Sequence, residues 1–312
     1  MKRSVLKILQ CPVTGKPLVK VGDTFKCERG EQEGEITYDC VGEKPVLVDF
    51  GSSVLERETC FRSDGSSVVK RSSYGILLRA AQRLISPVKP VTIENMSVFI
   101  ERLRKSNTKP TVLVVGGGTI GQGMKELYEN PDIDLIAFDI YESEHVDFVA
   151  DAHSIPIGKE TIDGVVIQAV LEHVVSPAHV VDEIHRVLKK GGLVYSETPF
   201  LQHVHEGPYD FTRFTDSGHR YLFRKFECLR SGASAGPGTQ LVWSLDYFFR
   251  SLFRSRLAGK VVKLLFFWLI YTDKVVSSQH SIDSASGVFF LGKKSERTLP
   301  AKELIEYYQG AQ

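Results

Sequence analysis

An α/β fold with a doubly wound, mostly parallel sheet is what this sequence predicts, and two observations lead to that prediction. From residue 109 onward, short apolar segments alternate with helical ones, which is typical of repeated strand–helix–strand units. Glycine or acidic residues follow several apolar segments, as expected where ligands meet the carboxyl ends of parallel strands. The chain has 312 residues, 42% of them apolar, so it can bury a sizeable core. Its net charge of +1 argues against a nucleic-acid partner.

The first 60 residues predict a small α+β module that precedes the main domain. A turn at Pro12 and Gly15 is followed by short strands over 24–27, 35–38 and 44–48. The N-terminus lacks the apolar run of a signal peptide, and the sequence has no Cys-x-x-Cys pair. Reduced thiols and a cytoplasmic location are therefore expected.

Three of the five cysteines, Cys11, Cys27 and Cys40, lie in this module. A structural zinc site needs four ligands, usually with paired cysteine spacing, and that spacing is missing here. We therefore predict a metal-free module and no metal in the protein, with a zinc site as the alternative.

Residues 61–108 are predicted to form a helical connector, with helices over 76–85 and 98–103. The main domain is predicted over 109–296. Its seven strands are expected at 111–115, 134–138, 146–150, 163–168, 193–197, 227–230 and 287–292.

Helices are predicted at two further places in the main domain. The segment 177–190 has Pro177 near its start and Gly191 after its end, which are typical helix boundaries. The stretch 234–284 separates the last two strands and is interpreted as a helical insertion. Residues 297–312 are predicted to be a C-terminal tail.

The segment Gly116-Gly-Gly-Thr-Ile-Gly121 predicts a ligand-binding turn. Glycines let the backbone approach a ligand, and the following helix N-terminus favours a carboxylate or phosphate. Together with Asp139, about twenty residues on, the spacing also fits a nicotinamide dinucleotide site.

Five features, in this order along the chain, favour another cofactor. They are the glycine turn after the first strand, Asp139, and the segments 151–157, 162–174 and 187–199. Their order and spacing resemble the core of class I S-adenosylmethionine-dependent methyltransferases of the type 11-like group. The resemblance implies a seven-stranded sheet, S-adenosylmethionine rather than NAD as cofactor, and a cofactor lid formed by the helix over 98–103.

The resemblance also implies a role for each cofactor-binding residue. Gly116 and Gly118 would contact the methionine part, and Asp139 would bind both ribose hydroxyls. Asp151 would accept from the adenine amino group, Ala152 would offer its backbone, and Gln168 would sit beside the methionine end. Two positions depart from the family pattern: Val114 stands where the acidic partner of the cofactor ammonium is usual, and Ile120 replaces a common glycine.

The N-terminal pattern Leu-x-Cys-Pro-x-Thr-Gly, followed by Cys27 and Pro45-Val-Leu-Val, resembles a second family. These are the zinc-ribbon-like activator domains that partner tRNA, ribosome and release-factor methyltransferases, together with their metal-free relatives. This resemblance implies an activator-type module over residues 1–60.

The loop over 200–214 is the predicted place of substrate chemistry. Its candidate catalytic residues are His203, His205, Tyr209, Asp210 and Arg213. A histidine can take a proton from a hydroxyl, an aspartate can orient it, and an arginine can hold an anionic group. On an extended loop the two histidines would face the same side. An internally bonded loop that caps the sheet is the alternative, and Glu172 with His173 is expected to shape the site.

The region 241–271 combines apolar residues at helical spacing with several arginines and lysines. Such a region could lie on an anionic membrane or bind a lipid-linked substrate; packing on the sheet or at a dimer contact is the alternative. Its longest apolar run is far below the ~20 residues that span a bilayer.

These observations predict an enzyme that transfers a methyl group from S-adenosylmethionine to a hydroxyl of a small molecule or glycan. The acceptor would be a small-molecule or lipid-linked compound, and the protein would be cytoplasmic with peripheral membrane contact. One alternative is an RNA or protein methyltransferase, suggested by the N-terminal resemblance. The other is a non-catalytic partner that binds the cofactor, suggested by Val114.

Overall fold

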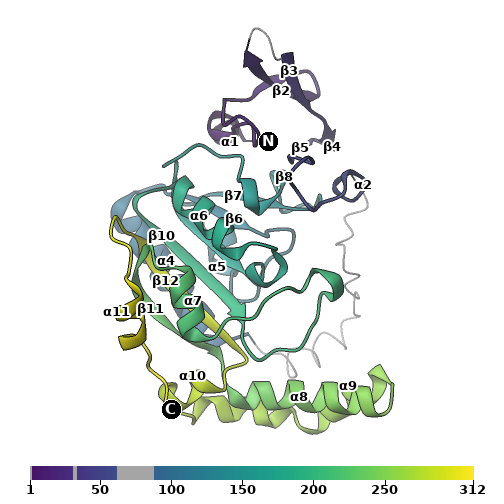
Figure 1. Cartoon of the computed structure of the whole chain (residues 1–312), viewed down its shortest axis with the longest axis vertical. Coiled ribbons are helices and arrows are strands. Elements are labelled where there is room, and N and C mark those ends of the chain that lie inside the picture. Colours follow the sequence, from purple (N-terminus) through teal and green to yellow (C-terminus); the bar gives the residue numbers. More distant parts are fainter. Residues whose placement is uncertain (1, 31–33, 62–87) are drawn as a thin grey trace.

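The computed structural model describes residues 2–30, 34–61 and 88–312. A small N-terminal part lies at one end, the large sheet fills the middle, and helices α8 (Pro237–Leu252) and α9 (Arg256–Leu265) run along the opposite end (Figure 1). The helix predicted over 76–85 falls outside the described residues.

Seven strands of the large sheet come from the predicted main domain. They are β6 (Thr111–Val115), β7 (Asp134–Asp139), β8 (Phe148–Ala150), β9 (Ile162–Gln168), β10 (Leu188–Pro199), β11 (Phe226–Ala235) and β12 (Gly287–Lys294). Their spatial order is β8-β7-β6-β9-β10-β12-β11, with β12 antiparallel to both of its neighbours. The predicted doubly wound, mostly parallel sheet is confirmed, and the order reverses between β6 and β9, where ligands bind in such folds.

The sheet has nine strands in the described part of the chain, so the predicted number of seven is wrong. β5 (Lys44–Leu47) pairs in parallel with β8, and β4 (Cys40–Val41) pairs with β5. Val46 and Val149 face each other in this register and are both buried. An open β8 edge would expose unpaired backbone groups, and these N-terminal strands cover it.

The rest of the N-terminal part is a three-stranded antiparallel sheet with one helix. Its elements are α1 (Arg3–Ile8), β1 (Val19–Val21), β2 (Thr24–Gly30) and β3 (Gly34–Tyr38). The Cys11 Sγ lies 3.0 Å from the Tyr38 hydroxyl, and the Cys27 Sγ lies 3.2 Å from the Thr14 hydroxyl. Cys40 lies apart from them in sequence on β4, where burial raises the pKa of its thiol.

Helix α4 (Pro90–Ser106) contains the predicted helix over 98–103 but is no cofactor lid. Its Phe99 and Leu103 are buried against Gly164 of β9, where a Cβ would lie only 2.7 and 2.8 Å from their carbons. Its apolar face packs on the sheet, because six of its side chains are buried there. The amphipathic pattern predicted the helix, and tertiary packing decided which surface it covers.

The remaining helices cover the sheet or extend from it. They are α2 (Arg57–Cys60), α5 (Lys125–Glu129), α6 (Pro177–Val187), α7 (Asp216–Leu222), α8 (Pro237–Leu252), α9 (Arg256–Leu265), α10 (Ser278–Asp283) and α11 (Ala301–Glu306), with short 3₁₀ turns η1 (Ala152–Ser154), η2 (Leu171–His173), η3 (Gly207–Tyr209) and η4 (Phe267–Lys274). α6 ends three residues before the predicted end because β10 begins at Leu188.

Candidate active site

A pocket opens at the carboxyl ends of β6, β7, β8 and β9, beside the glycine turn. Gly116 adopts φ +77°, and a Cβ there would lie 2.2 Å from a methyl carbon of Val170. A larger residue would be strained and would push into the pocket wall. The turn therefore lines the pocket with backbone and leaves free a space that a side chain would fill.

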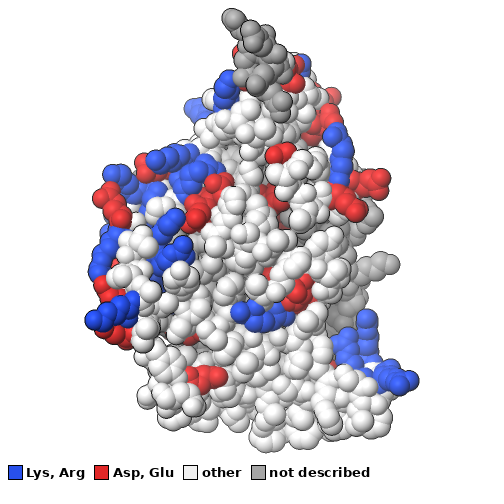
Figure 2. Space-filling view, viewed as in Figure 1, with Lys and Arg blue, Asp and Glu red and all other residues white. Residues whose placement is uncertain are grey.

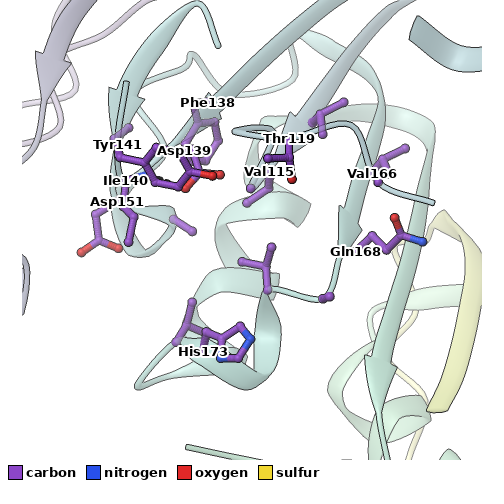
Figure 3. A pocket seen from close by; sticks show the side chains of 18 of the residues that line it. Val115, Thr119, Phe138, Asp139, Ile140, Tyr141, Asp151, Val166, Gln168 and His173 are labelled. Atoms are coloured by element: carbon purple, nitrogen blue, oxygen red, sulfur yellow. Dashed lines mark hydrogen bonds between the residues drawn. The ribbon is translucent and has the colours of Figure 1, made fainter. Parts of the chain in front are cut away.

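Asp139 joins the end of β7 to this cradle. Its Oδ2 accepts from the Gly118 amide at 2.8 Å, and its Oδ1 accepts from the Ile140 amide at 2.7 Å. The carboxylate lies on one side of the pocket, with Gln168 on another side and His173 on a third (Figure 3). Each carboxylate oxygen can accept more than one hydrogen bond, so Asp139 could accept from two ribose hydroxyls, the role that the family resemblance implies.

Asp151 lies at the end of β8 and is tied to the N-terminal part. Its Oδ1 accepts from the His153 amide at 2.9 Å and lies 2.7 Å from the His153 Nδ1, and its Oδ2 accepts from the Ser53 hydroxyl. Burial by itself raises the pKa of Asp151, but the hydrogen bonds from His153 and Ser53 outweigh it, so the pKa is lowered. Asp151 and its neighbour Ala152 both line the pocket, and their role toward the adenine stays a prediction.

Gln168, at the end of β9, lies at the junction of two pockets. Its Nε2 donates to the Gln122 carbonyl at 3.2 Å and to the Glu197 carboxylate at 3.1 Å. Its Oε1 is directed toward Gly121, where a Cβ would lie 2.0 Å from it. The amide oxygen is thereby turned toward the glycine turn, and Val114, the position that lacks the family's acidic residue, lines the same pocket.

The second pocket lies beyond Gln168, and most of the residues that line it are polar or charged. Burial by itself raises the pKa of Glu197 in its wall, but Lys89 and the hydrogen bonds of Thr92 and Tyr195 outweigh it and lower that pKa. The lining residues are Lys89, Gln122, Gln168, Ala169, Glu172, Glu197, Thr198, Pro199, Gln202, His205 and Ser234. A hydroxylated molecule would find hydrogen-bond partners on every side of such a pocket.

Three side chains converge at the edge of both pockets. The Glu172 Oε1 lies 3.6 Å from the His173 Nε2 and 4.0 Å from the His205 Nε2, and the two imidazole rings meet edge to face at 4.9 Å. Glu172 is fully buried, and its two oxygens have no hydrogen-bond partner. Burial raises the pKa of Glu172 to about 8 and lowers the pKa of His173.

The orientation of both histidines is set at their Nδ1 atoms. The His173 Nδ1 lies 2.7 Å from the Tyr209 carbonyl, and the His205 Nδ1 lies 3.2 Å from the His203 carbonyl. A carbonyl accepts only, so each Nδ1 carries a hydrogen, and in the neutral imidazole each Nε2 then presents a lone pair. Two lone pairs and an unpartnered carboxyl group therefore face one another.

Asp210 and Arg213 hold the loop that carries His205. Asp210 accepts from the His205 amide at 2.9 Å and from the Arg213 Nη2 at 2.9 Å, and its Oδ2 lies 3.5 Å from the His205 Nδ1. Burial by itself raises the pKa of Asp210, but the bond to Arg213 and the His205 amide hold it well below its usual range. Arg213 also donates to the Gln202, His203 and Thr212 carbonyls, so its guanidinium positions the loop.

His203 and His205 do not face the same side. The His203 ring stacks on Tyr247 of α8, with centroids 4.4 Å apart and an 11° angle between the planes. The loop is bent by the contacts of Arg213 and Asp210, so the alternation expected of an extended chain does not apply. Of the predicted loop residues, only His205 lines the polar pocket, and Tyr209 lines the other.

Glu172, His173 and His205 could also hold a cation. Their ligand atoms all lie within 4.8 Å of one another, the only group of this kind found in the described ranges. A metal with bonds of ~2.1 Å would need ligand atoms roughly 3.4 Å apart, so small side-chain movements would be required.

Sequence reasoning missed two contributions to the site. The sequence predicts only that Glu172 shapes the site, whereas its burial strongly raises the pKa of its carboxyl group. No local sequence pattern reports that burial. Ser53, Val54 and Leu55 of the N-terminal part reach the cofactor-side pocket. Their contribution depends on the pairing of β5 with β8, which joins segments about a hundred residues apart.

Comparison with known proteins identifies the class of the main domain. Residues 113–196 match the family model described as a methyltransferase domain. This match covers the glycine turn, Asp139, Asp151 and the β9 motif, and it confirms the predicted class for that segment, with S-adenosylmethionine as the cofactor. Comparison with curated proteins gave no significant match.

Comparison with solved structures found several methyltransferases that match about two thirds of this chain, with TM-scores below 0.5. A protein from Galdieria sulphuraria described as a sarcosine dimethylglycine methyltransferase is 15% identical, covers 66% of this chain and 86% of its own, and has a TM-score of 0.44. Phosphoethanolamine N-methyltransferase 2 from Haemonchus contortus is 15% identical over 65% of this chain and 53% of its own, with a TM-score of 0.41. Geranyl diphosphate C-methyltransferase from Streptomyces coelicolor A3(2) is 10% identical over 64% and 75%, also at 0.41. With these scores, the class of the domain rests on the family match alone.

Proposed function

We propose that this protein transfers the methyl group of S-adenosylmethionine to a hydroxyl oxygen of a small-molecule or glycan-type acceptor. The observation behind this proposal is the placement of His205. His205 lines the polar pocket, its Nε2 lies 4.0 Å from the Glu172 carboxyl group that lines the same pocket, and its Nδ1 faces Asp210 and the His203 carbonyl. That is the arrangement of a general base with an orienting carboxylate.

The cofactor would be held at the glycine turn. Gly116 and Gly118 offer backbone there, Asp139 suits the ribose hydroxyls, and Asp151 with Ala152 lines the adenine end. The Gln168 Oε1 would accept from the cofactor ammonium in place of the acidic residue that Val114 replaces. When bound, S-adenosylmethionine supplies a methyl group already activated on a sulfonium.

The chain's own residues would then do three things. The polar pocket binds and orients the hydroxylated acceptor beside Gln168, which is the main contribution that methyl transfer requires. The His205 Nε2 takes the hydroxyl proton as the oxygen becomes methylated. Asp210, kept ionised by Arg213, stabilises the imidazolium that results.

The polar lining of the second pocket supports a hydroxylated acceptor over an apolar one. Lys89, Gln202 and Ser234 bring donors and acceptors from three different segments of the chain. Only Ala169 and Pro199 among the lining residues have apolar side chains, and the carbon atoms of the polar residues form the rest of the apolar wall, as suits the ring carbons of a hydroxylated molecule.

The test uses a matched pair of ring-preserving variants, His205→Phe and His203→Phe. Both keep an aromatic ring in the same loop and remove its nitrogens. Transfer of labelled methyl groups to a panel of hydroxylated sugars and glycolipids should fall 10²- to 10⁴-fold in His205→Phe, the range typical of a lost general base. His203→Phe should stay within a fewfold of the unsubstituted protein.

Two controls accompany this pair. Calorimetry should give the same affinity for S-adenosylmethionine in both variants and no binding in Asp139→Ala. The assay is repeated after dialysis against a chelator and after readdition of Mg²⁺, Mn²⁺ or Zn²⁺. Equal loss of transfer in both histidine variants would contradict a base at His205, and loss on chelation would assign the cluster to a metal instead. Methylation of RNA or protein, with none of the sugars modified, would contradict the acceptor class.

A further inference from the structure

Helices α8 and α9 with η4 form a hairpin that presents a broad apolar surface. Its exposed side chains include Phe248, Leu252, Phe253, Leu257, Leu265 and Trp268, which are between 54% and 69% exposed. Scattered exposed apolar residues are normal, but so many on adjacent elements mark an interaction surface.

The spacing of these residues shows that the surface is one face of each helix. Phe248 and Leu252 are four residues apart on α8, and Leu257 and Leu265 are eight apart on α9. The opposite face of α9 is buried at Gly259 and at Val262. The hairpin thus packs through its inner side and presents apolar side chains on its outer side.

The hairpin is a tightly built unit. A Cβ on Gly259 would lie 2.1 Å from the Asp246 carboxylate, so α9 packs closely on α8. The Lys263 Nζ pairs with the Asp246 carboxylate at 3.0 Å. Asp273 of η4 accepts from the Gly238 amide at 2.7 Å and caps the start of α8. The outer face is therefore held in place by the inner contacts.

The charges of the hairpin are of one sign on its outside. Between residues 237 and 276 there are six lysines and arginines and two acidic residues. Both acidic side chains, Asp246 and Asp273, are used in the inner contacts just described. Arg254, Arg256 and Lys260 are exposed near the turn between the helices. Lysine and arginine gather at that end of the hairpin, next to an otherwise uncharged face (Figure 2).

From this combination we propose that the outer face of the α8–α9–η4 hairpin docks on the surface of an anionic lipid bilayer. An apolar face beside basic side chains is the chemistry of helices that lie in the membrane interface. The helices are about 24 and 15 Å long, shorter than the ~30 Å hydrocarbon core. No helix within the described ranges is long and apolar enough to cross a membrane.

The hairpin is also joined to the acceptor loop. Tyr247 on α8 stacks on His203, and its hydroxyl donates to the Val204 carbonyl at 2.8 Å. Gln240 on the same helix donates to the Leu201 carbonyl at 2.8 Å. Docking would thus bring the loop that carries His205 to the bilayer surface. Resting on the proposed function, this assigns the acceptor as a hydroxylated headgroup on a lipid tail.

The experiment is co-sedimentation of the full chain with vesicles of phosphatidylcholine alone or with 30% phosphatidylglycerol. We expect binding to the anionic vesicles that weakens as salt rises. The double variant Phe253→Ser/Leu257→Ser should bind at least about tenfold more weakly, since each side chain loses its apolar burial. The double variant Arg254→Glu/Arg256→Glu should lose the preference for anionic vesicles.

The matched control is Ile305→Ser, which removes a 79%-exposed apolar side chain from α11, outside the hairpin. It should bind vesicles as the unsubstituted chain does, and circular dichroism should show all variants folded. Absence of vesicle binding, or equal loss in the control, overturns the proposal. A dimer that the hairpin variants dissociate would instead assign the face to a second copy of the chain.

Vesicle binding needs no cofactor, so its outcome is independent of methyl transfer. If the chain binds vesicles but methylates neither soluble nor lipid-linked hydroxyls, the proposed function fails and the docking surface stands. If it methylates soluble sugars and ignores vesicles, the reverse holds.

Discussion

The cofactor end and the acceptor end of this site are built in different ways. The cofactor end consists of strand ends and one tight turn, in which Gly116 and Asp139 are fixed by backbone contacts. The acceptor end consists of the 200–214 loop, whose shape depends on side chains: Arg213 bonds Asp210 and three carbonyls, and Tyr247 supports His203. The sheet determines the geometry of the cofactor end, whereas side-chain contacts within the loop and with α8 determine the geometry of the acceptor end.

This difference indicates that the fold constrains the cofactor end tightly, whereas the acceptor end can vary. A turn at the end of β6 has little freedom to vary, because its neighbours leave no space for a Cβ. A loop braced by side chains can be reshaped by a few substitutions, so specificity for the acceptor is expected there. Three predictions test this difference between the cofactor end and the acceptor end of the site.

The largest effect is expected from one substitution made at each end, Gly116→Ala and Gly207→Ala. Both glycines have positive φ, +77° and +59°, so both variants carry a backbone cost of roughly 1–2 kcal/mol. Only at Gly116 would the new Cβ collide with a wall residue, 2.2 Å from Val170; at Gly207 nothing lies within 4 Å. We expect S-adenosylmethionine affinity, measured by calorimetry, to fall about a hundredfold or more in the first variant, at roughly 1.4 kcal/mol per tenfold, and to be retained in the second.

A comparable loss in both glycine variants would mean that strain alone, and not the collision, sets the affinity. The free space around Gly116 and Gly207 would then not explain any difference between the two ends of the site.

The second effect concerns Glu172, which stands between the two ends. Burial raises the pKa of Glu172 to about 8, so the folded state holds a proton that the unfolded state releases at a pH near 4.5. The stability that this group contributes is therefore complete below about pH 4.5 and is lost as pH rises through 8. Glu172→Gln has no such proton, and its free energy of unfolding should gain on that of the unsubstituted protein by up to about 1.4 kcal/mol per pH unit between these values.

Urea unfolding of both proteins from pH 5 to pH 9 measures this difference. Parallel curves would show that the carboxylate is ionised and compensated by a cation. In that case a chelator should destabilise the unsubstituted protein and leave Glu172→Gln unchanged.

The smallest effect is expected from Tyr247→Phe, which keeps the stacking on His203 and removes the bond to the Val204 carbonyl. Loss of one such bond costs about 1 kcal/mol, which thermal unfolding can detect. Cofactor affinity should not change, because Tyr247 contacts the acceptor loop and its α8 neighbours Trp243 and Arg250 and does not line the cofactor-side pocket. A weaker cofactor affinity would show that the two ends are not independent.

The sequence predicted the sheet far better than it predicted the loop. Every expected strand from 111–115 to 287–292 overlaps an observed one, because apolar periodicity is a local property that the chain carries in each segment. The orientation of His203 and His205 is not local. It depends on Arg213, Asp210 and Tyr247, which only the folded chain brings together.

Non-local pairing explains the other errors. The two additional strands, β4 and β5, read as part of a separate module because their partner β8 lies about a hundred residues later. The helix over 98–103 was expected over the cofactor, since amphipathicity reports that one face is buried but not against which surface. The same limit applies to Glu172, because the sequence shows that the residue is a glutamate but does not show that it is buried.

The pairing of β5 with β8 has a consequence for the synthesis of this chain. β5 leaves the ribosome early and finds only β4 as a local neighbour. Its other edge, and the contacts of Gln10 and Ile8 with Pro156 and Gly158, must wait for more than a hundred further residues. The first part to be made is therefore among the last to be completed, and the edge of β5 stays open to foreign strands in the meantime. Prompt folding of the later segments shortens the time during which this edge can pair with another chain.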